Sequence, residues 1–400
     1  MINSSELPDG SIIWLAVAGF AIYVVSYIIY NLFWHPLASF PGPFVAAVTP
    51  LYKAYIDLVV KSSLVHTLEK LHSQYGSTPA DLFYAYRCMS VEVITYLCFG
   101  NNLDAISARN YEAPIIKAMD SSLPVFVGFK HSSLLKETII NCPPKLSRLI
   151  SPATAGLVDL QEQLLKAQIS DLTTNPESLV NLPHSTTIYH ELLRPQAYRS
   201  GTVPSAASLY EEAQALLFGG ADTTGTTLMH GSFYVLNTPA VYQKLKAELR
   251  SNWRVLDEAP SLSEFEKFPY LTAVIKESLR MSPGVASPLP RVVPSSGAYI
   301  AKTFIPGGTV VGMSSHFVHR DKTIFPNPDE FIPERWLNDK RTDLDKCLAW
   351  AELYLCFAHV FRKFEIEVDP SSPKKLEWRD CFLPEYRGPH LKAVVTKVVA

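Results

Sequence analysis

The chain has little charge, and neither sign is in excess. Charged residues make up 18% of its 400 residues, and 36 Lys and Arg stand against 38 Asp and Glu, a formal net charge of −2. Globular domains carry about 25% charged residues, so this composition excludes a disordered, strongly solvated chain. Because no basic stripe stands out, we expect no nucleic-acid partner.

Several short motifs are absent, and each absence excludes a class of protein. The six cysteines form no C-x-x-C pair, which argues against a disulfide framework and a zinc ribbon. The sequence also lacks G-x-G-x-x-G, a P-loop lysine motif, G-x-S-x-G and H-E-x-x-H. His316 and His319 lie three residues apart, but no third ligand accompanies them, so no metal site is expected there.

The longest apolar run of the chain lies near its N-terminus. Residues 12–34 contain no charged residue, and a helix of this length spans about 30 Å of hydrocarbon. Lys53 and Lys61 follow the run and no Lys or Arg precedes it, so the positive-inside rule places the body on the cytosolic side. We expect a single transmembrane anchor at 12–34 behind a lumenal N-terminus, residues 1–11. A buried core helix is the alternative.

A stiff hinge should follow the anchor at residues 35–50. Pro41 and Pro43 fix their φ angles, and Gly42 between them permits a tight turn. On the other side of the anchor, Asn3 begins an N-x-S sequon that would lie in the lumen, so we expect a glycoprotein.

The body, residues 51–400, is predicted to be mainly α with a minor β region. Apolar residues recur at helical spacing over the segments 64–75, 86–99, 155–172, 208–236, 239–251 and 270–281. Strand-like runs are short and come late in the chain, at 291–293, 309–313 and 392–399.

One helical segment has an unusual middle. The stretch 216–227 holds three glycines, four threonines and one acid. Each glycine costs about 1 kcal/mol relative to alanine in a helix, and threonine can bond its own backbone. We therefore expect a long central helix with a loosened middle turn, where Gly219 and Gly220 admit a flat group and Asp222 and Thr223 exchange protons beside it. A close helix crossing with satisfied hydroxyls is the other interpretation.

Two further motifs could form one network. Glu277 and Arg280 lie three residues apart on one helical face and can pair, although most such pairs are solvated and contribute only a few tenths of a kcal/mol. Arg335 follows a rigid proline in the stretch 331–336. If Arg335 reaches the other two, the three would form a buried network that fixes this stretch onto the helix.

Taken in order, the stretches 219–224, 277–280 and 331–336 resemble three signatures of the cytochrome P450 family, the haem-thiolate monooxygenases. The stretch 210–336 is similar to microsomal fungal members that act in secondary metabolism. The resemblance implies a cytochrome P450-like fold, incomplete in this chain, behind the N-terminal helix.

The resemblance implies roles for the polar residues of these signatures. Thr223 would hydrogen-bond dioxygen at the iron, and Asp222 would help to deliver protons for cleavage of the O–O bond. Glu277, Arg280 and Arg335 would form the structural network behind the haem.

The resemblance also implies which residues face the cofactor and the substrate. Arg291 would pair with a haem propionate, with an exposed charge at a strand edge as the alternative. Val285, Ala286 and Ser287 would belong to a loop that faces the substrate.

The implied activity is hydroxylation or epoxidation of an apolar small molecule, such as a terpenoid or another secondary metabolite. Haem b would be the cofactor, with electrons from NADPH delivered by NADPH–cytochrome P450 reductase. The protein would be a single-pass protein of the endoplasmic reticulum membrane.

The chain departs from the family at two places. No glycine occurs between Gly312 and Gly388, so the glycine-containing loop that carries the iron-ligating cysteine is missing. Cys347 is the cysteine nearest to that position, at the expected start of a helix whose dipole favours a thiolate, and it is the candidate iron ligand.

A Trp-x-x-x-Arg helix that grips the haem is missing as well, and we place the two breaks near residues 76–77 and 346–347. The alternative function is therefore a catalytically inactive, truncated homologue or gene-model product without haem, acting at most as a binding scaffold. Haem content distinguishes the two.

Overall fold

The structure is a computed structural model that describes residues 9–35, 38, 43–49, 52, 79–140, 146, 148–149, 151–184, 187–337 and 347–398. The chain divides into two compact units, Met1–Thr78 and Pro79–Ala400. Several predictions lie outside the described residues: the sequon at Asn3, residues 36–37, 39–42 and 50 of the hinge, the helix 64–75, the break at 76–77 and residue 346 of the second break.

The N-terminal unit contains two described helices, α1 (Asp9–Phe33) and α2 (Phe44–Val48). Helix α1 covers nearly all of the predicted anchor, and its large apolar side chains are exposed, Trp14 at 74% and Phe20 at 68%. In the part of the chain that the structure describes, no helix combines the length and the apolar character of a membrane span. The anchor therefore stays a prediction.

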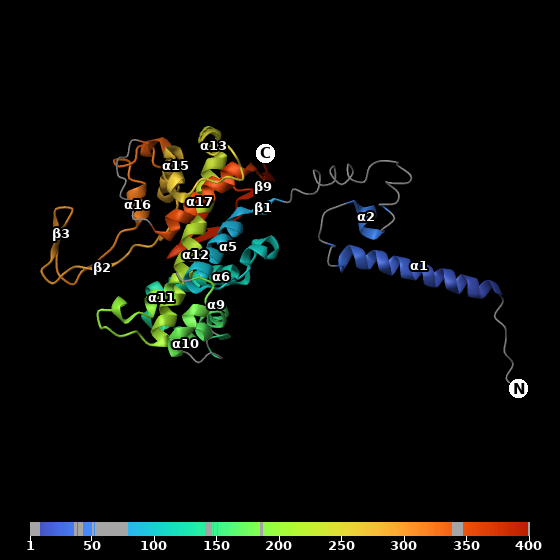
Figure 1. Ribbon diagram of the computed structural model, residues 1–400, viewed down its shortest axis with the longest axis horizontal. Helices are drawn as coiled ribbons and strands as arrows, with labels where there is room; N and C mark the ends of the chain where they lie inside the picture. Colours follow the sequence, from blue (N-terminus) through green and yellow to red (C-terminus); the bar gives the residue numbers. More distant parts are fainter. Residues whose placement is uncertain are drawn as a thin grey trace. The chain divides into compact units, whose positions relative to one another are not determined.

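The C-terminal unit is mostly helical, as predicted (Figure 1). Five predicted helices are confirmed, with 155–172 divided among α9, a π-helical turn (Glu162–Lys166) and α10. The helices are α5 (Leu82–Phe99), α6 (Pro114–His131), α7 (Ser133–Ile140), α9 (Pro152–Gln161), α10 (Ala167–Thr174), α11 (Ile188–Leu192), α12 (Ala206–Asn237), α13 (Pro239–Asn252), α14 (Leu262–Phe265), α15 (Pro269–Met281), α16 (Ser315–His319) and α17 (Leu348–Lys363).

The strands form four small antiparallel sheets, which confirms the minor β region. The largest sheet has the order β1-β9-β6, in which β9 joins the start of the unit to its end, with Ala80 opposite Ala393. The strands are β1 (Ala80–Asp81), β2 (Arg291–Val292), β3 (Ala298–Ile300), β4 (Thr303–Ile305), β5 (Val310–Val311), β6 (Phe364–Val368), β7 (Glu377–Cys381), β8 (Leu383–Arg387) and β9 (Lys392–Lys397). The pairs β2·β5, β3·β4 and β7·β8 are separate two-stranded ribbons.

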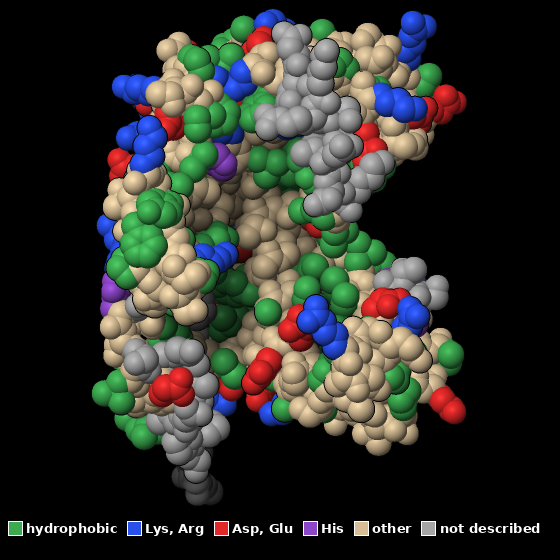
Figure 2. Space-filling view, turned by 90° about the vertical axis from the view of Figure 1, so that its left-hand side faces the viewer, with side chains coloured by type: hydrophobic (Ala, Val, Ile, Leu, Met, Phe, Trp, Pro, Cys, Tyr) green, Lys and Arg blue, Asp and Glu red, His purple; other side chains and the backbone are tan. Residues whose placement is uncertain are grey.

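Helix α12 connects two hydrophobic cores. Its N-terminal half, up to Ala221, packs into a core that it shares with α5, α6, α9 and α10. From Leu228 onward it packs into a second core with α13, α15 and α17. The turn with Asp222 and Thr223 therefore lies at the junction of the two cores. Figure 2 shows a face of the protein that is hollowed in its middle, with hydrophobic side chains in the hollow.

Candidate functional site

Helix α12 continues without a break through the glycine- and threonine-rich stretch, so the predicted loosened turn is wrong. The threonine hydroxyls bond back onto the helix: Thr223 Oγ1 donates to the Gly219 carbonyl at 2.8 Å, and Thr227 Oγ1 to the Thr223 carbonyl at 3.0 Å. These bonds satisfy the hydroxyls without opening the helix.

The glycines of this stretch serve two purposes. A Cβ atom at Gly220 would lie 2.6 Å from Cγ1 of Ile94, and one at Gly225 would lie 2.8 Å from Cα of Arg87, so both permit the close crossing of α12 and α5. At Gly219, in contrast, no described atom lies within 4 Å of such a Cβ. Gly219 is exposed and its surroundings are open, whereas Gly220 packs against α5, so the expected room beside the helix exists at Gly219 and not at Gly220.

The acid of this helix faces a buried arginine rather than its threonine neighbour. Arg87 of α5 is fully buried, and its Nη2 lies 2.6 Å from Asp222 Oδ1 while its Nη1 donates to Asp120 Oδ1 at 2.6 Å. Burial alone would lower the pKa of Arg87, but the two carboxylates outweigh it and raise the pKa above its ordinary value. For Asp120, burial dominates over Arg87 and raises the pKa.

Asp222 and Thr223 therefore do not form the expected joint pair. Asp222 is 4% exposed and held by α5, whereas Thr223 is half-buried beside the open space at Gly219. The sequence analysis did not identify Arg87. The sequence feature that could have indicated Arg87 is a charged residue within the apolar helical pattern of 86–99.

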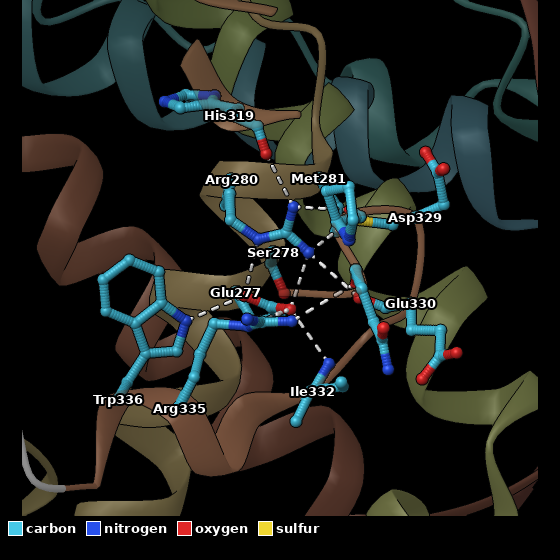
Figure 3. Close-up of polar contacts among 12 residues, drawn as sticks. Glu277, Ser278, Arg280, Met281, His319, Asp329, Glu330, Ile332, Arg335 and Trp336 are labelled. Carbon is cyan, nitrogen blue, oxygen red and sulfur yellow. Dashed lines mark hydrogen bonds and ion pairs between the residues drawn. The ribbon is translucent and has the colours of Figure 1, made fainter. Parts of the chain in front are cut away.

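The structure brings Glu277, Arg280 and Arg335 together in one buried network (Figure 3). The Glu277 carboxylate is fully buried and accepts N–H groups from Arg280 at 2.8 and 2.9 Å and from Arg335 Nε at 3.2 Å. The backbone of Ile332 and the indole of Trp336 also donate to it, at 2.9 and 2.8 Å. Burial raises the pKa of Glu277, but the donors, with Arg280 first, outweigh burial and lower it overall.

Arg280 extends this network to the segment before Arg335. Its guanidinium donates to the carbonyls of His319, Pro328 and Glu330 at 2.7–2.9 Å. The network therefore fixes the irregular segment 319–336 onto α15.

The predicted substrate loop is held by the β7–β8 hairpin. The backbone N–H of Ala286 donates to the Phe382 carbonyl at 3.0 Å, and Ser287 Oγ donates to Asp380 Oδ1 at 2.5 Å. Val285 packs against a small apolar cluster. The buried members of that cluster are Leu123, Cys381 and Leu383.

Arg291 does not join the other candidates. It lies exposed on β2, and its Nη1 donates to the carbonyl of Pro290 at 2.9 Å. This placement is that of the exposed strand-edge charge, and Arg291 would have to turn from it to meet a cofactor.

Cys347 is the residue that precedes α17 at its N-terminus, and its thiol is free and exposed. The residue after it, Leu348, packs against the core that contains Leu217 and Ala221 of α12. Two other cysteines, Cys356 and Cys381, lie in packed surroundings, and burial raises the pKa of both thiols. Cysteine thiolate is one of the protein ligands that hold haem iron, so the donor chemistry of Cys347 fits a haem.

The helical scaffold is similar to that of a solved structure. The structure resembles the solved cytochrome P450DA heme domain with a TM-score of 0.63 and 14% sequence identity, over 80% of this chain and 69% of that one. At this identity the likeness shows the fold alone.

The sequence gives the family. The family model described as Cytochrome P450 matches residues 44–388. The chain therefore belongs to the cytochrome P450 family and is an enzyme of the cytochrome P450 monooxygenase type.

Curated fungal proteins are similar to the chain over most of its length. It is 30% identical to the cytochrome P450 monooxygenase penB of Penicillium thymicola over 320 residues, 76% of this chain and 71% of penB. It is 25% identical to the cytochrome P450 monooxygenase BOT1 of Botryotinia fuckeliana over 493 positions, 95% of each chain. Because 95% of 400 residues is about 380, about 110 aligned positions of BOT1 face gaps inside this chain.

Proposed function

We propose that this enzyme is a membrane-anchored haem-thiolate monooxygenase that hydroxylates or epoxidises an apolar secondary metabolite, such as a terpenoid. The observation that carries the proposal is the free, exposed thiol of Cys347 at the start of α17 in a chain of this family. Cys347 would ligate the iron of haem b, and Arg291 would turn toward a propionate. When bound, the haem supplies the activation of O2 and its insertion into the substrate.

The residues of α12 would manage protons beside the cofactor. The Thr223 hydroxyl, which now donates to the Gly219 carbonyl, can rotate toward the open space at Gly219 and donate there. The Asp222 carboxylate, held 2.6 Å from Arg87 Nη2, would take up a proton through water and pass it on.

The substrate side is apolar. Val285 packs beside Phe218 and Leu123, and the hydrogen bonds of Ala286 and Ser287 to the β7–β8 hairpin fix the loop in place. Such a wall selects by shape and apolar contact. It supports an apolar small molecule as the substrate.

The first test is the reduced carbon-monoxide difference spectrum of the full chain, expressed in membranes with haem supplied. We expect the red-shifted Soret band of thiolate ligation, lost in Cys347→Ser and retained in the control Cys98→Ser. Absence of a haem band would overturn the proposal and favour the alternative, in which the protein is an inactive homologue without haem. The gaps inside the alignment with BOT1 are the observation that favours this second candidate.

We also propose that residues 12–34 anchor the protein in the endoplasmic reticulum membrane, with residues 1–11 lumenal, Asn3 glycosylated and NADPH–cytochrome P450 reductase as the electron donor. The uncharged run in the sequence supports this. Carbonate washing should leave the full chain in the membrane fraction and release a variant that lacks residues 1–34. Release of both would contradict the anchor.

A further inference from the structure

An open pocket of about 190 Å³ lies between the start of α5, α6 and the β7–β8 hairpin. Neither the predicted catalytic residues nor the haem ligand lines it. Its walls combine three aromatic rings, two carboxylates and one imidazole. These belong to Phe83, Tyr84, Tyr386, Asp120, Glu385 and His390.

The carboxylates give the pocket a negative wall. None of the described residues that line it is Lys or Arg. Asp120 shares the buried Arg87 with Asp222, so one positive charge serves two negative ones. Glu385 pairs with Arg379 and Arg387 at long N–O separations of 3.8 and 3.9 Å. A cation in the pocket would therefore gain attraction from charges that the protein leaves incompletely paired.

The aromatic rings favour an organic cation. The ring of Phe83 lies 5.1 Å from that of Tyr386, and the ring of Tyr84 lies 5.0 Å from that of His390. The Arg87 guanidinium lies 4.8 Å from the centre of the Phe83 ring, so this ring takes a cation–π contact, and Arg87 occupies one of its faces. Among the described residues no three His, Cys, Asp or Glu side chains could hold a metal ion, which argues against an inorganic cation.

The pocket adjoins the apolar substrate wall. Leu123 lines the pocket and also belongs to the cluster against which Val285 and Phe218 pack. A molecule with its charged end between Asp120 and Glu385 could thus lay its apolar body along this cluster.

We propose that this pocket binds the ammonium group of the substrate, so that the substrate is an apolar molecule with a basic amine. That the bound amine is a substrate rests on the proposed monooxygenase function, whereas the cation site itself does not require haem.

The test compares two probes of nearly the same shape, choline and its uncharged analogue 3,3-dimethylbutan-1-ol, by calorimetric titration of the full chain. A quaternary ammonium cannot ligate iron, so the signal does not depend on haem. We expect at least tenfold tighter binding of choline, which is about 1.4 kcal/mol. Equal binding of the two probes would overturn the proposal.

Variants assign the site to its residues. Asp120→Asn and Glu385→Gln should each reduce choline affinity by about tenfold or more and leave the binding of the alcohol unchanged. The matched control is Asp159→Asn on α9, because Asp159 pairs with Arg148 at the surface and should not matter. If Asp120→Asn does not fold, Glu385→Gln decides, and unchanged choline affinity there contradicts the site.

The outcome can be separated from that of the proposed function. A chain without a haem band that still prefers choline keeps the cation site and loses the monooxygenase proposal. A chain with the thiolate spectrum and no preference for choline loses only the cation site.

Discussion

Replacement of Glu277 by glutamine should cost about 3–5 kcal/mol of unfolding free energy, the usual loss when one partner of a buried ion pair is removed. The carboxylate is fully buried, and both of its oxygens accept hydrogen bonds. The amide of glutamine keeps one acceptor, but its NH2 group would face the N–H donors of Arg280 and Trp336. Arg280 would also lose its buried counter-charge. Domains of ordinary stability have about 5–15 kcal/mol in total, so this loss is large.

The assay is urea unfolding followed by far-UV circular dichroism, with Glu191→Gln as the matched control. Glu191 and Arg194 have the same three-residue spacing and the same N–O distance of 2.8 Å, but their side chains are 64% and 58% exposed. We expect a loss below about 1 kcal/mol there. Equal losses for the two variants would refute the reasoning, because burial would then have no effect on the energy of the pair.

The Glu277 carboxylate should also affect how the stability of the protein depends on pH. Because the folded protein lowers the pKa of Glu277, its contribution to stability is present above the ordinary carboxylate pKa and is lost as the pH falls through the lowered value. Glu277→Gln should remove this part of the acid sensitivity. A variant that keeps the wild-type acid profile would contradict the assignment.

Three further changes test other parts of the structure. Gly231→Ala should lower the unfolding free energy by about 1–3 kcal/mol because its Cβ would overlap Phe357, whereas Gly219→Ala in the same helix meets no described atom within 4 Å and should raise it by up to about 1 kcal/mol. Thermal unfolding of both variants checks this, and equal shifts would contradict it. Burial raises the pKa of Glu352 to about 7, so stability should fall as the pH rises from about 4.5 to 7. In Glu352→Gln, the change in unfolding free energy between pH 4.5 and 7, measured by urea titration, should be smaller by about 3 kcal/mol. A wild-type slope in the variant would count against this assignment. In the haem-loaded enzyme, Thr223→Ala should increase the hydrogen peroxide formed per NADPH consumed, and unchanged coupling would remove its role.

The sequence predicted the long helices with a clear apolar spacing, including α12, and it missed two elements that contain a residue unusual for their structure. Helix α6 was missed, and Pro124 lies inside it, where proline lacks a backbone donor and ordinarily ends a helix. The β7–β8 hairpin was missed because its turn has no glycine or asparagine: Phe382 adopts a φ of 80° between paired Cys381 and Leu383. Local patterns cannot indicate a turn that the contacts of the whole fold stabilise.

The candidate site was predictable in a similar, partial way. Spacing placed Glu277 and Arg280 on one face, but whether the pair is buried depends on Arg335, 55 residues further along, and only the fold brings it there. The ion pair between Arg87 and Asp222 could not be predicted either, because the two residues lie on helices that are distant in sequence. Long-range ion pairs leave no periodic signal.

The stability of the scaffold and the chemistry of this chain can be separated. The core around α12, α13, α15 and α17 is built from described residues with a continuous apolar interior, and the Glu277 network fixes the segment 319–336. The loop and the helix that the sequence resemblance predicts to be missing would, by that resemblance, contact the cofactor rather than this core. A chain can therefore keep the fold while changing its iron site, since packing in the core does not depend on the bound group. One buried carboxylate oxygen on α17, Oε2 of Glu352, receives no hydrogen bond from the described residues. Native proteins seldom leave such an atom without a partner, and burial of this carboxyl raises its pKa to about 7.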